Sequence, residues 1–147
     1  MLIFAALSIC RLFMPKRIKI IFLFLVLIQG LHSIEEYIGK LWDVFPPARF
    51  LTGLVSNNHG TGFLIINIGL FIFGIWCWLF PVRKEYASAA GFIWSWIIIE
   101  MINGIGHPLW TLFEGRYEPG VITSLPLLIL STYLGILLIN IKKIGKA

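Results

Sequence analysis

Residues 61–81 read TGFLIINIGLFIFGIWCWLFP, a run of 21 residues without a single charged side chain. About 20 mostly apolar residues allow an α-helix to cross the hydrocarbon part of a bilayer. The whole chain fits this interpretation, since 59% of its 147 residues are hydrophobic, 13% are charged and the mean hydropathy is +0.90. Soluble domains carry about 25% charged residues. The composition therefore excludes a disordered chain, a small disulfide-stapled protein and a soluble enzyme with an ordinary surface.

Three further stretches are long and apolar enough to cross a bilayer. The one nearest the C-terminus has no charged residue, and the one before it contains a single charge, Glu100. The alternation of apolar and polar residues that marks the strands of a membrane barrel is missing from the sequence. We therefore predict an all-α polytopic membrane protein, built as a bundle of four transmembrane helices. The membrane domain is expected at 18–141, with spans at about 18–38, 61–81, 87–107 and 120–141.

The segments between the spans carry residues that form turns. Residues 40–60 contain Phe45-Pro46-Pro47 and Asn57-Asn58-His59-Gly60, and both strings are typical of loops. Pro108 follows directly on His107, and the residue before a proline is disfavoured in a helix. We therefore expect the third helix to end at His107.

Both ends of the chain are expected to lie outside the bilayer. Residues 1–17 are interpreted as an N-terminal extension and basic flank, and 142–147 as a basic cytoplasmic tail. Residues 1–10 are apolar but lack the basic lead of a secretory signal. We expect Met14 to open the working protein, and the sequence leaves open whether 1–13 belong to its mature form.

The distribution of positive charge predicts an orientation in the membrane. Nine of the 12 lysines and arginines lie in the N-terminal flank, the turn between the second and third spans, and the C-terminal tail. The positive-inside rule therefore places both termini in the cytoplasm and the two longer loops outside. These residues stand at the ends of segments instead of forming a stripe, so no nucleic-acid partner is expected. The nine are Arg11, Lys16, Arg17, Lys19, Arg83, Lys84, Lys142, Lys143 and Lys146.

In this orientation the polar residues of the spans gather in their outer halves. On the first helix Gln29, His32 and Glu36 share one face, because residues three or four apart lie on the same side of a helix. Glu100, Asn103 and His107 share a face of the third helix in the same way. With that helix ending at His107, Glu100 lies about 10 Å below its end. Two such faces, turned toward each other, would close one polar site.

Three short strings carry a family resemblance. His32-Ser33-Ile34-Glu35-Glu36 reads H-x-x-E-E, Asn103-Gly104-Ile105-Gly106-His107 reads N-x-x-x-H, and residues 117–123 read Y-x-P-G-x-x-T. Together, over roughly residues 18–141, they resemble the HXXEE-motif family of small bacterial membrane proteins with several spans. That family has no assigned function. The resemblance implies a membrane fold and the positions of a site, but no substrate.

The residue types suggest a divalent metal site, with zinc, iron or manganese as the expected ions. Histidine and glutamate one helix turn apart can bind the same ion, so His32, Glu36 and His107 are candidate ligands. His59, in the string NNHGTG, is a fourth candidate. The alternative for the first helix is a carboxylate pair solvated at the interface, with His32 as a packing partner.

Four further residues are candidate catalytic groups. Glu35 or Glu100 is interpreted as a general base, with Asn103 and Tyr117 as hydrogen-bonding groups at the same site. Thr123 either orients a ligand or bonds back to its own helix. The alternative for Glu100, Asn103 and His107 is a set of interhelical hydrogen bonds that hold the bundle together.

Three functions are compatible with these residues. The first is an integral membrane enzyme of the bacterial cytoplasmic membrane, acting on a lipid or small apolar molecule by metal-dependent hydrolysis or by metal-free proton transfer, as an isomerase does. The second is a non-catalytic binder or transporter of a small ligand or metal ion, and the third a structural subunit. The membrane lipid is the expected partner, and a homo-oligomer stays open. Walker, G-x-G-x-x-G and G-x-S-x-G motifs are missing from the sequence, so no nucleotide or flavin is expected.

Overall fold

The computed structural model describes the backbone of residues 14–144 and the side chains of residues 14–140, and within this range all regular structure is helical. Four long helices have the length and apolar character needed to cross a membrane. The prediction of an all-α fold with four helices long and apolar enough to cross a membrane is confirmed, and these helices suggest an integral membrane protein. The elements are α1 (Lys16–Ile38), α2 (Leu41–Val44), α3 (Pro46–Val55), α4 (His59–Cys77), η1 (Trp78–Val82), α5 (Ala89–Glu114) and α6 (Val121–Ile144).

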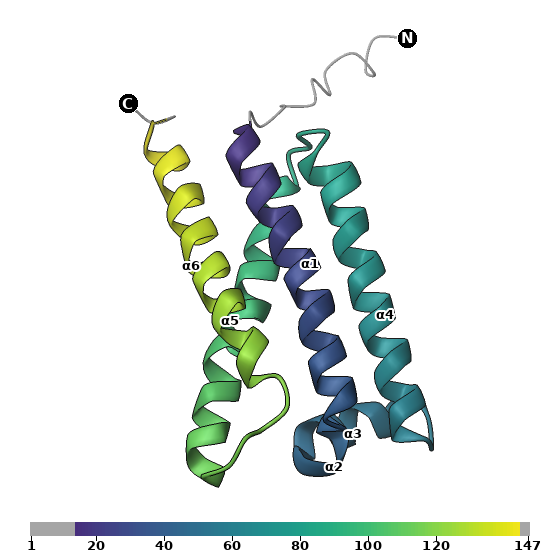
Figure 1. Ribbon diagram of the computed structural model, residues 1–147. Coiled ribbons are helices and arrows are strands. Elements are labelled where there is room, and N and C mark those ends of the chain that lie inside the picture. Colours follow the sequence, from purple (N-terminus) through teal and green to yellow (C-terminus); the bar gives the residue numbers. More distant parts are fainter. Residues whose placement is uncertain (1–13, 145–147) are drawn as a thin grey trace, which may run out of the picture.

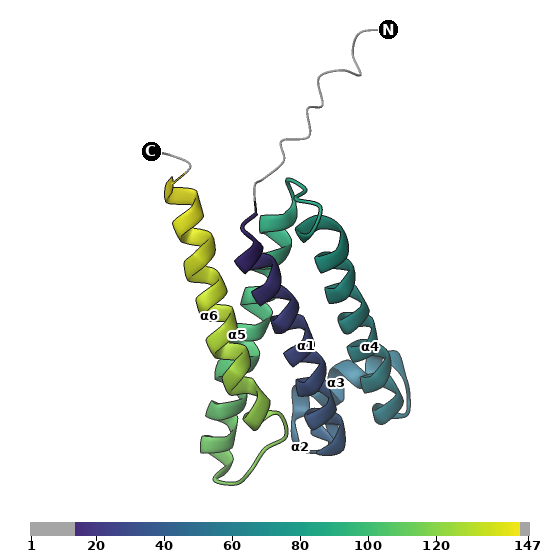
Figure 2. The same cartoon turned by 45° about the horizontal axis from the view of Figure 1, so that its top comes forward.

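The long helices form an up-and-down bundle (Figure 1). Helix α1 lies between α4 on one side and α6 on the other, and α6 also packs along α5. The described chain begins and ends at the same end of the bundle. The opposite end carries α2, α3 and the connection 115–120, and we call it the loop end (Figures 1 and 2). Each long helix therefore joins these two ends.

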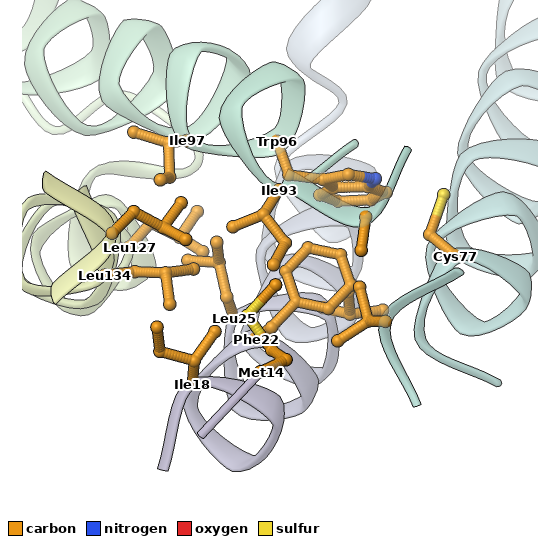
Figure 3. Packing of buried hydrophobic residues seen from close by; sticks show 14 residues of the cluster. Met14, Ile18, Phe22, Leu25, Cys77, Ile93, Trp96, Ile97, Leu127 and Leu134 are labelled. Atoms are coloured by element: carbon orange, nitrogen blue, oxygen red, sulfur yellow. The ribbon is translucent and has the colours of Figure 1, made fainter. Parts of the chain in front are cut away.

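The buried face of α1 changes character along its length. Toward the chain termini it consists of Ile18, Phe22, Leu25 and Val26, which recur every three or four residues as an apolar helix face requires. Toward the loop end the same face continues with polar residues. Figure 3 shows the apolar part meeting side chains of the other long helices. These partners are Cys77, Ile93, Trp96, Ile97, Leu127 and Leu134.

The apolar half of the bundle holds its register by close packing. Phe22 meets Trp96 edge to face, with ring centroids 6.2 Å apart. Beyond this half, between Asn103 and His107, a methyl group on Gly104 would lie 2.6 Å from Cβ of Leu128, so α5 and α6 also approach closely toward the loop end. The bundle is therefore packed tightly near the termini, and its polar residues collect in the remaining half.

The segment 40–60 is only in part the loop that the sequence predicts. It contains α2 and α3, and α3 begins at Pro46-Pro47 because proline is well suited to the first turn of a helix, where its missing N–H has no partner to lose. Asn58 then caps α4, its side chain accepting a hydrogen bond of 2.9 Å from the Thr61 amide. The turn residues mark helix starts here as well as loops.

The prediction that the third helix ends at His107 is wrong. Helix α5 continues through Pro108 to Glu114. A membrane helix tolerates an internal proline because the freed backbone groups find other partners. The helix ends instead at Gly115, whose left-handed conformation (φ 65°) lets its N–H reach the Thr111 carbonyl at 3.0 Å. Glu100 therefore lies about 21 Å from the end of α5, at about 1.5 Å per residue, and not about 10 Å.

At the C-terminal end α6 continues to Ile144, so the first three residues of the predicted tail extend the helix. The extension predicted for residues 1–13, and the tail residues 145–147, lie outside the described residues.

Candidate metal centre

Three predicted ligands meet near the loop end. Nε2 of His32 lies 3.3 Å from Oε1 of Glu36, one turn later on α1, and Nε2 of His107 on α5 lies 3.1 Å from the same oxygen. The two imidazole rings stand edge to face with centroids 4.7 Å apart. One donor atom from each residue lies within 4.8 Å of the other two, and no other such trio of His, Cys, Asp or Glu occurs in the described chain.

The meeting point is shielded from solvent. The His32 side chain is 0% exposed, and those of Glu36 and His107 are 9% and 11% exposed. Nε2 of His32 is buried without a hydrogen-bond partner among the described residues. A buried polar atom left in this way is rare and unfavourable. An ion between the three side chains would satisfy it.

Glu35 points away from this trio and toward the start of α6. Its carboxylate accepts hydrogen bonds from the Tyr117 hydroxyl at 2.7 Å, the Ile122 amide at 3.1 Å, and the Thr123 amide and hydroxyl at 2.9 and 2.5 Å. The first amides of a helix have no partner within the helix, and a negative charge there is favourable. Glu35 on α1 thus caps α6, a role the sequence did not predict.

Tyr117 serves this cap as a donor. Burial and the hydrogen bond to the Glu35 carboxylate raise the pKa of Tyr117 to about 12. The hydroxyl therefore keeps its proton at neutral pH. Tyr117 therefore donates to the Glu35 carboxylate and helps to orient it.

The loop before α6 touches both histidines. Nδ1 of His32 lies 2.8 Å from Oγ1 of Thr123. Gly120 has φ +94°, and a Cβ on it would lie 2.7 Å from two ring atoms of His107 and 2.8 Å from Cε1 of His32. Only glycine fits a position of that conformation and that contact. The Y-x-P-G-x-x-T string therefore packs directly on His32 of H-x-x-E-E and on His107 of N-x-x-x-H.

A second polar group lies next to the trio, deeper in the bundle. Glu100 is 0% exposed and accepts a hydrogen bond of 3.3 Å from the Asn103 amide. When the side-chain amide of Gln29 is rotated by 180°, its nitrogen lies 2.8 and 3.2 Å from the two carboxylate oxygens of Glu100 and can donate to them. Gln29 precedes His32 by one turn on the same face of α1, so Glu100 and Asn103 are neighbours of the trio.

Ser33 is a polar residue that sequence reasoning missed. Its hydroxyl donates to Oδ1 of Asn67 at 2.8 Å and so connects α1 to α4. Its place within the H-x-x-E-E string, four residues after Gln29, was the available signal. This contact lies on the side of α1 that packs against α4.

His59 does not join the other predicted ligands. It begins α4, and its Nδ1 lies 3.0 Å from Oγ1 of Thr52 on α3. Helix α4 packs against α1 and α3, whereas His107 comes from α5. The string NNHGTG made His59 a candidate ligand, but it did not indicate on which side of α1 the residue lies.

A small cavity lies beside His107, one member of the trio. Its volume is about 100 Å³, and His107 and Asn103 provide its polar wall. A wider apolar hollow of about 450 Å³ adjoins it at Phe45 and Trp110, whose rings meet at 5.2 Å. The remaining lining residues of the cavity are Leu41, Ile102 and Gly106.

The comparisons with known proteins agree with the sequence resemblance. The chain matches the family described as "Protein of unknown function with HXXEE motif" over residues 20–134, which is well over half of its length. Neither a curated protein nor a solved structure matches the chain. The H-x-x-E-E string of that description is the one that supplies His32, Glu35 and Glu36. The chain belongs to this HXXEE family of unknown function.

Proposed function

We propose that this chain is an integral membrane enzyme that uses one divalent metal ion, held by His32, Glu36 and His107, to act on a lipid or small apolar molecule. One observation carries the proposal: the buried Nε2 of His32 and Nε2 of His107, whose side chain is 11% exposed, converge on one carboxylate oxygen, and the nitrogen of His32 has no other partner. Two histidines and one glutamate form a donor set found in zinc hydrolases, and iron and manganese also accept it.

A divalent ion in such a site polarises a carbonyl or phosphoryl oxygen and lowers the pKa of a bound water to about 7. The chain supplies the proton-accepting group, and we assign this role to Glu100. Glu35, the other candidate, already accepts four hydrogen bonds at the start of α6. Asn103 and Gln29 hold the Glu100 carboxylate in place.

The cavity beside His107 and Asn103 supports a substrate with a small polar group and an apolar body. About 100 Å³ accommodates a small polar group such as an ester, and the apolar hollow next to Phe45 and Trp110 suits a hydrocarbon tail. Such a molecule would enter sideways from the membrane.

The positive charge at the end opposite the loop end supports an orientation with both termini in the cytoplasm. The site then belongs to the outer half of a bacterial cytoplasmic membrane. The apolar packing around Phe22 and Trp96 fills the other half of the described bundle. This packing disfavours a polar path across the membrane, and so favours an enzyme over an ion transporter.

Metal analysis of the purified protein tests the proposal. The protein is extracted in detergent without chelator, and bound metal is measured by mass spectrometry for the wild type and for His32→Ala, Glu36→Gln and His107→Ala. We expect close to one metal ion per wild-type chain and a loss of it in each variant. Those preparations that hold metal are then assayed for hydrolysis of lipid esters.

His59→Ala is the matched control, because it removes a histidine that lies apart from the trio. It should retain the metal. Circular dichroism and a thermal melt verify that every variant is folded. A folded wild type that neither carries nor takes up zinc, iron or manganese would rule out the metal centre.

A further inference from the structure

We propose that Glu35 and Thr123 fix the tautomer of His32, so that the two glutamates of H-x-x-E-E have different tasks: Glu36 binds the ion, and Glu35 positions a ligand through a hydroxyl. This inference rests on the proposed metal site and deepens it. Glu35 and Thr123 are positioning residues, since neither reaches the ion position itself.

The argument starts from the count of hydrogens. A carboxylate that receives two backbone amides and a phenol acts as an acceptor only. The Thr123 hydroxyl has one hydrogen and lies 2.5 Å from the Glu35 carboxylate, a distance typical of a strong O–H···O⁻ bond. That hydrogen is therefore given to Glu35.

The tautomer of His32 follows from this assignment. With its hydrogen used, the Thr123 oxygen can only accept at its 2.8 Å contact with Nδ1 of His32. His32 must then carry its hydrogen on Nδ1. In the neutral ring, Nε2 on the opposite side then has a free lone pair directed toward Glu36 and His107.

A lone pair that faces a carboxylate oxygen at 3.3 Å is unfavourable unless a cation lies between them. Histidines that bind metals usually give their other N–H to a carboxylate or carbonyl, which sets the ring orientation and strengthens the ligand. Here the carboxylate acts through one intervening hydroxyl. The relay Glu35–Thr123–His32 prepares the site before an ion arrives.

The relay also gives a reason for the string Y-x-P-G-x-x-T. Tyr117 and Thr123 both donate to Glu35, and Gly120 lets the loop lie on both imidazole rings. The same carboxylate caps the first amides of α6. The start of α6 and the geometry of His32 are thus held by one group on α1.

Thr123→Val and Thr123→Ser test the relay in the full-length protein. Valine keeps the shape of threonine but has no hydroxyl, and serine keeps the hydroxyl. We expect zinc to bind the valine variant about 10- to 100-fold more weakly than the wild type, and the serine variant with nearly wild-type affinity. Affinity is measured by competition between the protein and a chromophoric chelator.

A second measurement needs no metal. The ¹⁵N shifts of labelled histidine in the metal-free protein report which ring nitrogen carries the hydrogen. His32, assigned with His32→Ala, should be protonated on Nδ1 in the wild type and the serine variant, and should become a mixture of tautomers in the valine variant.

Thr52→Val is the matched control, since Thr52 makes a comparable 3.0 Å contact to Nδ1 of His59, away from the trio. It should change neither the zinc affinity nor the His32 signal. Equal zinc affinity and an unchanged tautomer in Thr123→Val would overturn the relay. A wild type that fails to bind zinc refutes the proposed function instead, whereas the ¹⁵N result still decides whether the relay exists.

Discussion

Substitution of Gly120 by alanine should damage the metal centre although Gly120 offers no ligand. The new Cβ would lie 2.7 Å from two ring atoms of His107, and ordinary contact begins at 3.4 Å, so the ring must retreat by about 0.7 Å. Metal–ligand distances tolerate only about 0.2 Å. Nε2 of His107 lies 3.1 Å from Oε1 of Glu36, and the displacement of its ring is therefore several times larger than the change in metal–ligand distance that the site tolerates.

The same substitution strains the backbone. Gly120 has φ +94°, and a residue other than glycine held in such a region costs about 1–3 kcal/mol. We expect Gly120→Ala to lower the free energy of unfolding by at least about 2 kcal/mol once the contact with both histidines is included. Zinc affinity should fall by at least about tenfold.

The assays are reversible unfolding in mixed detergent and zinc titration. Gly69→Ala is the control, because a Cβ at that glycine of α4 would meet nothing within 4 Å. It should leave zinc affinity unchanged. If Gly120→Ala binds zinc as tightly as the wild type, the close packing of the 115–120 loop on the histidines cannot be what shapes the site.

Three further predictions follow from other contacts. Gly104→Ala should lower the free energy of unfolding by about 1–3 kcal/mol, because its Cβ would press on Leu128 at 2.6 Å; an unfolding midpoint equal to that of the wild type would contradict the close approach of α5 and α6. The pKa of Tyr117 is raised from 10.0 to about 12, so the protonated hydroxyl stabilises the folded state fully below about pH 10, and this stabilisation is lost as the pH rises through about 12. Between about pH 10 and 12 the melting temperature of the wild type should therefore fall by more than that of Tyr117→Phe. An equal fall in the two proteins would refute the assignment. Gly106→Leu should fill the cavity beside His107, lowering turnover of any lipid ester found to be a substrate while zinc still binds, and unchanged kcat/KM would exclude this cavity as the entrance.

The spans could be predicted because a helix needs about 20 mostly apolar residues to cross a bilayer, and the run at 61–81 has that length without a charged residue. The residues that share a face of each helix could also be predicted. His32 and Glu36 are one turn apart, and the buried face of α1 that contains them begins with Ile18 and Phe22. Such a periodicity follows from the helix alone.

The contacts between helices could not be predicted in the same way. Glu35 is adjacent to Glu36 in sequence, so the two side chains leave α1 in directions about 100° apart. Nothing in the string indicates that the first glutamate meets the amides of α6. His59 was a candidate ligand by residue type, but it begins α4, and α4 packs on the side of α1 that carries Ser33.

The end of the third helix was misplaced for a related reason. In water Pro108 disfavours a helix, because the helix loses one backbone hydrogen bond and the residue before a proline prefers an extended conformation. Helix α5 nevertheless continues to Glu114, and the added turns carry Trp110, which forms the wall of the cavity beside His107. The cavity was therefore invisible in the sequence.

The ligands themselves provide the most direct test. Zinc K-edge X-ray absorption is measured on the wild-type protein loaded with one equivalent of zinc. Two imidazole nitrogens at about 2.0–2.1 Å and a carboxylate oxygen at about 2.0–2.2 Å are expected from His32, His107 and Glu36. One imidazole should disappear from the spectrum of His107→Ala. A spectrum without imidazole scattering, or one that His107→Ala leaves unchanged, would contradict a metal centre at this site.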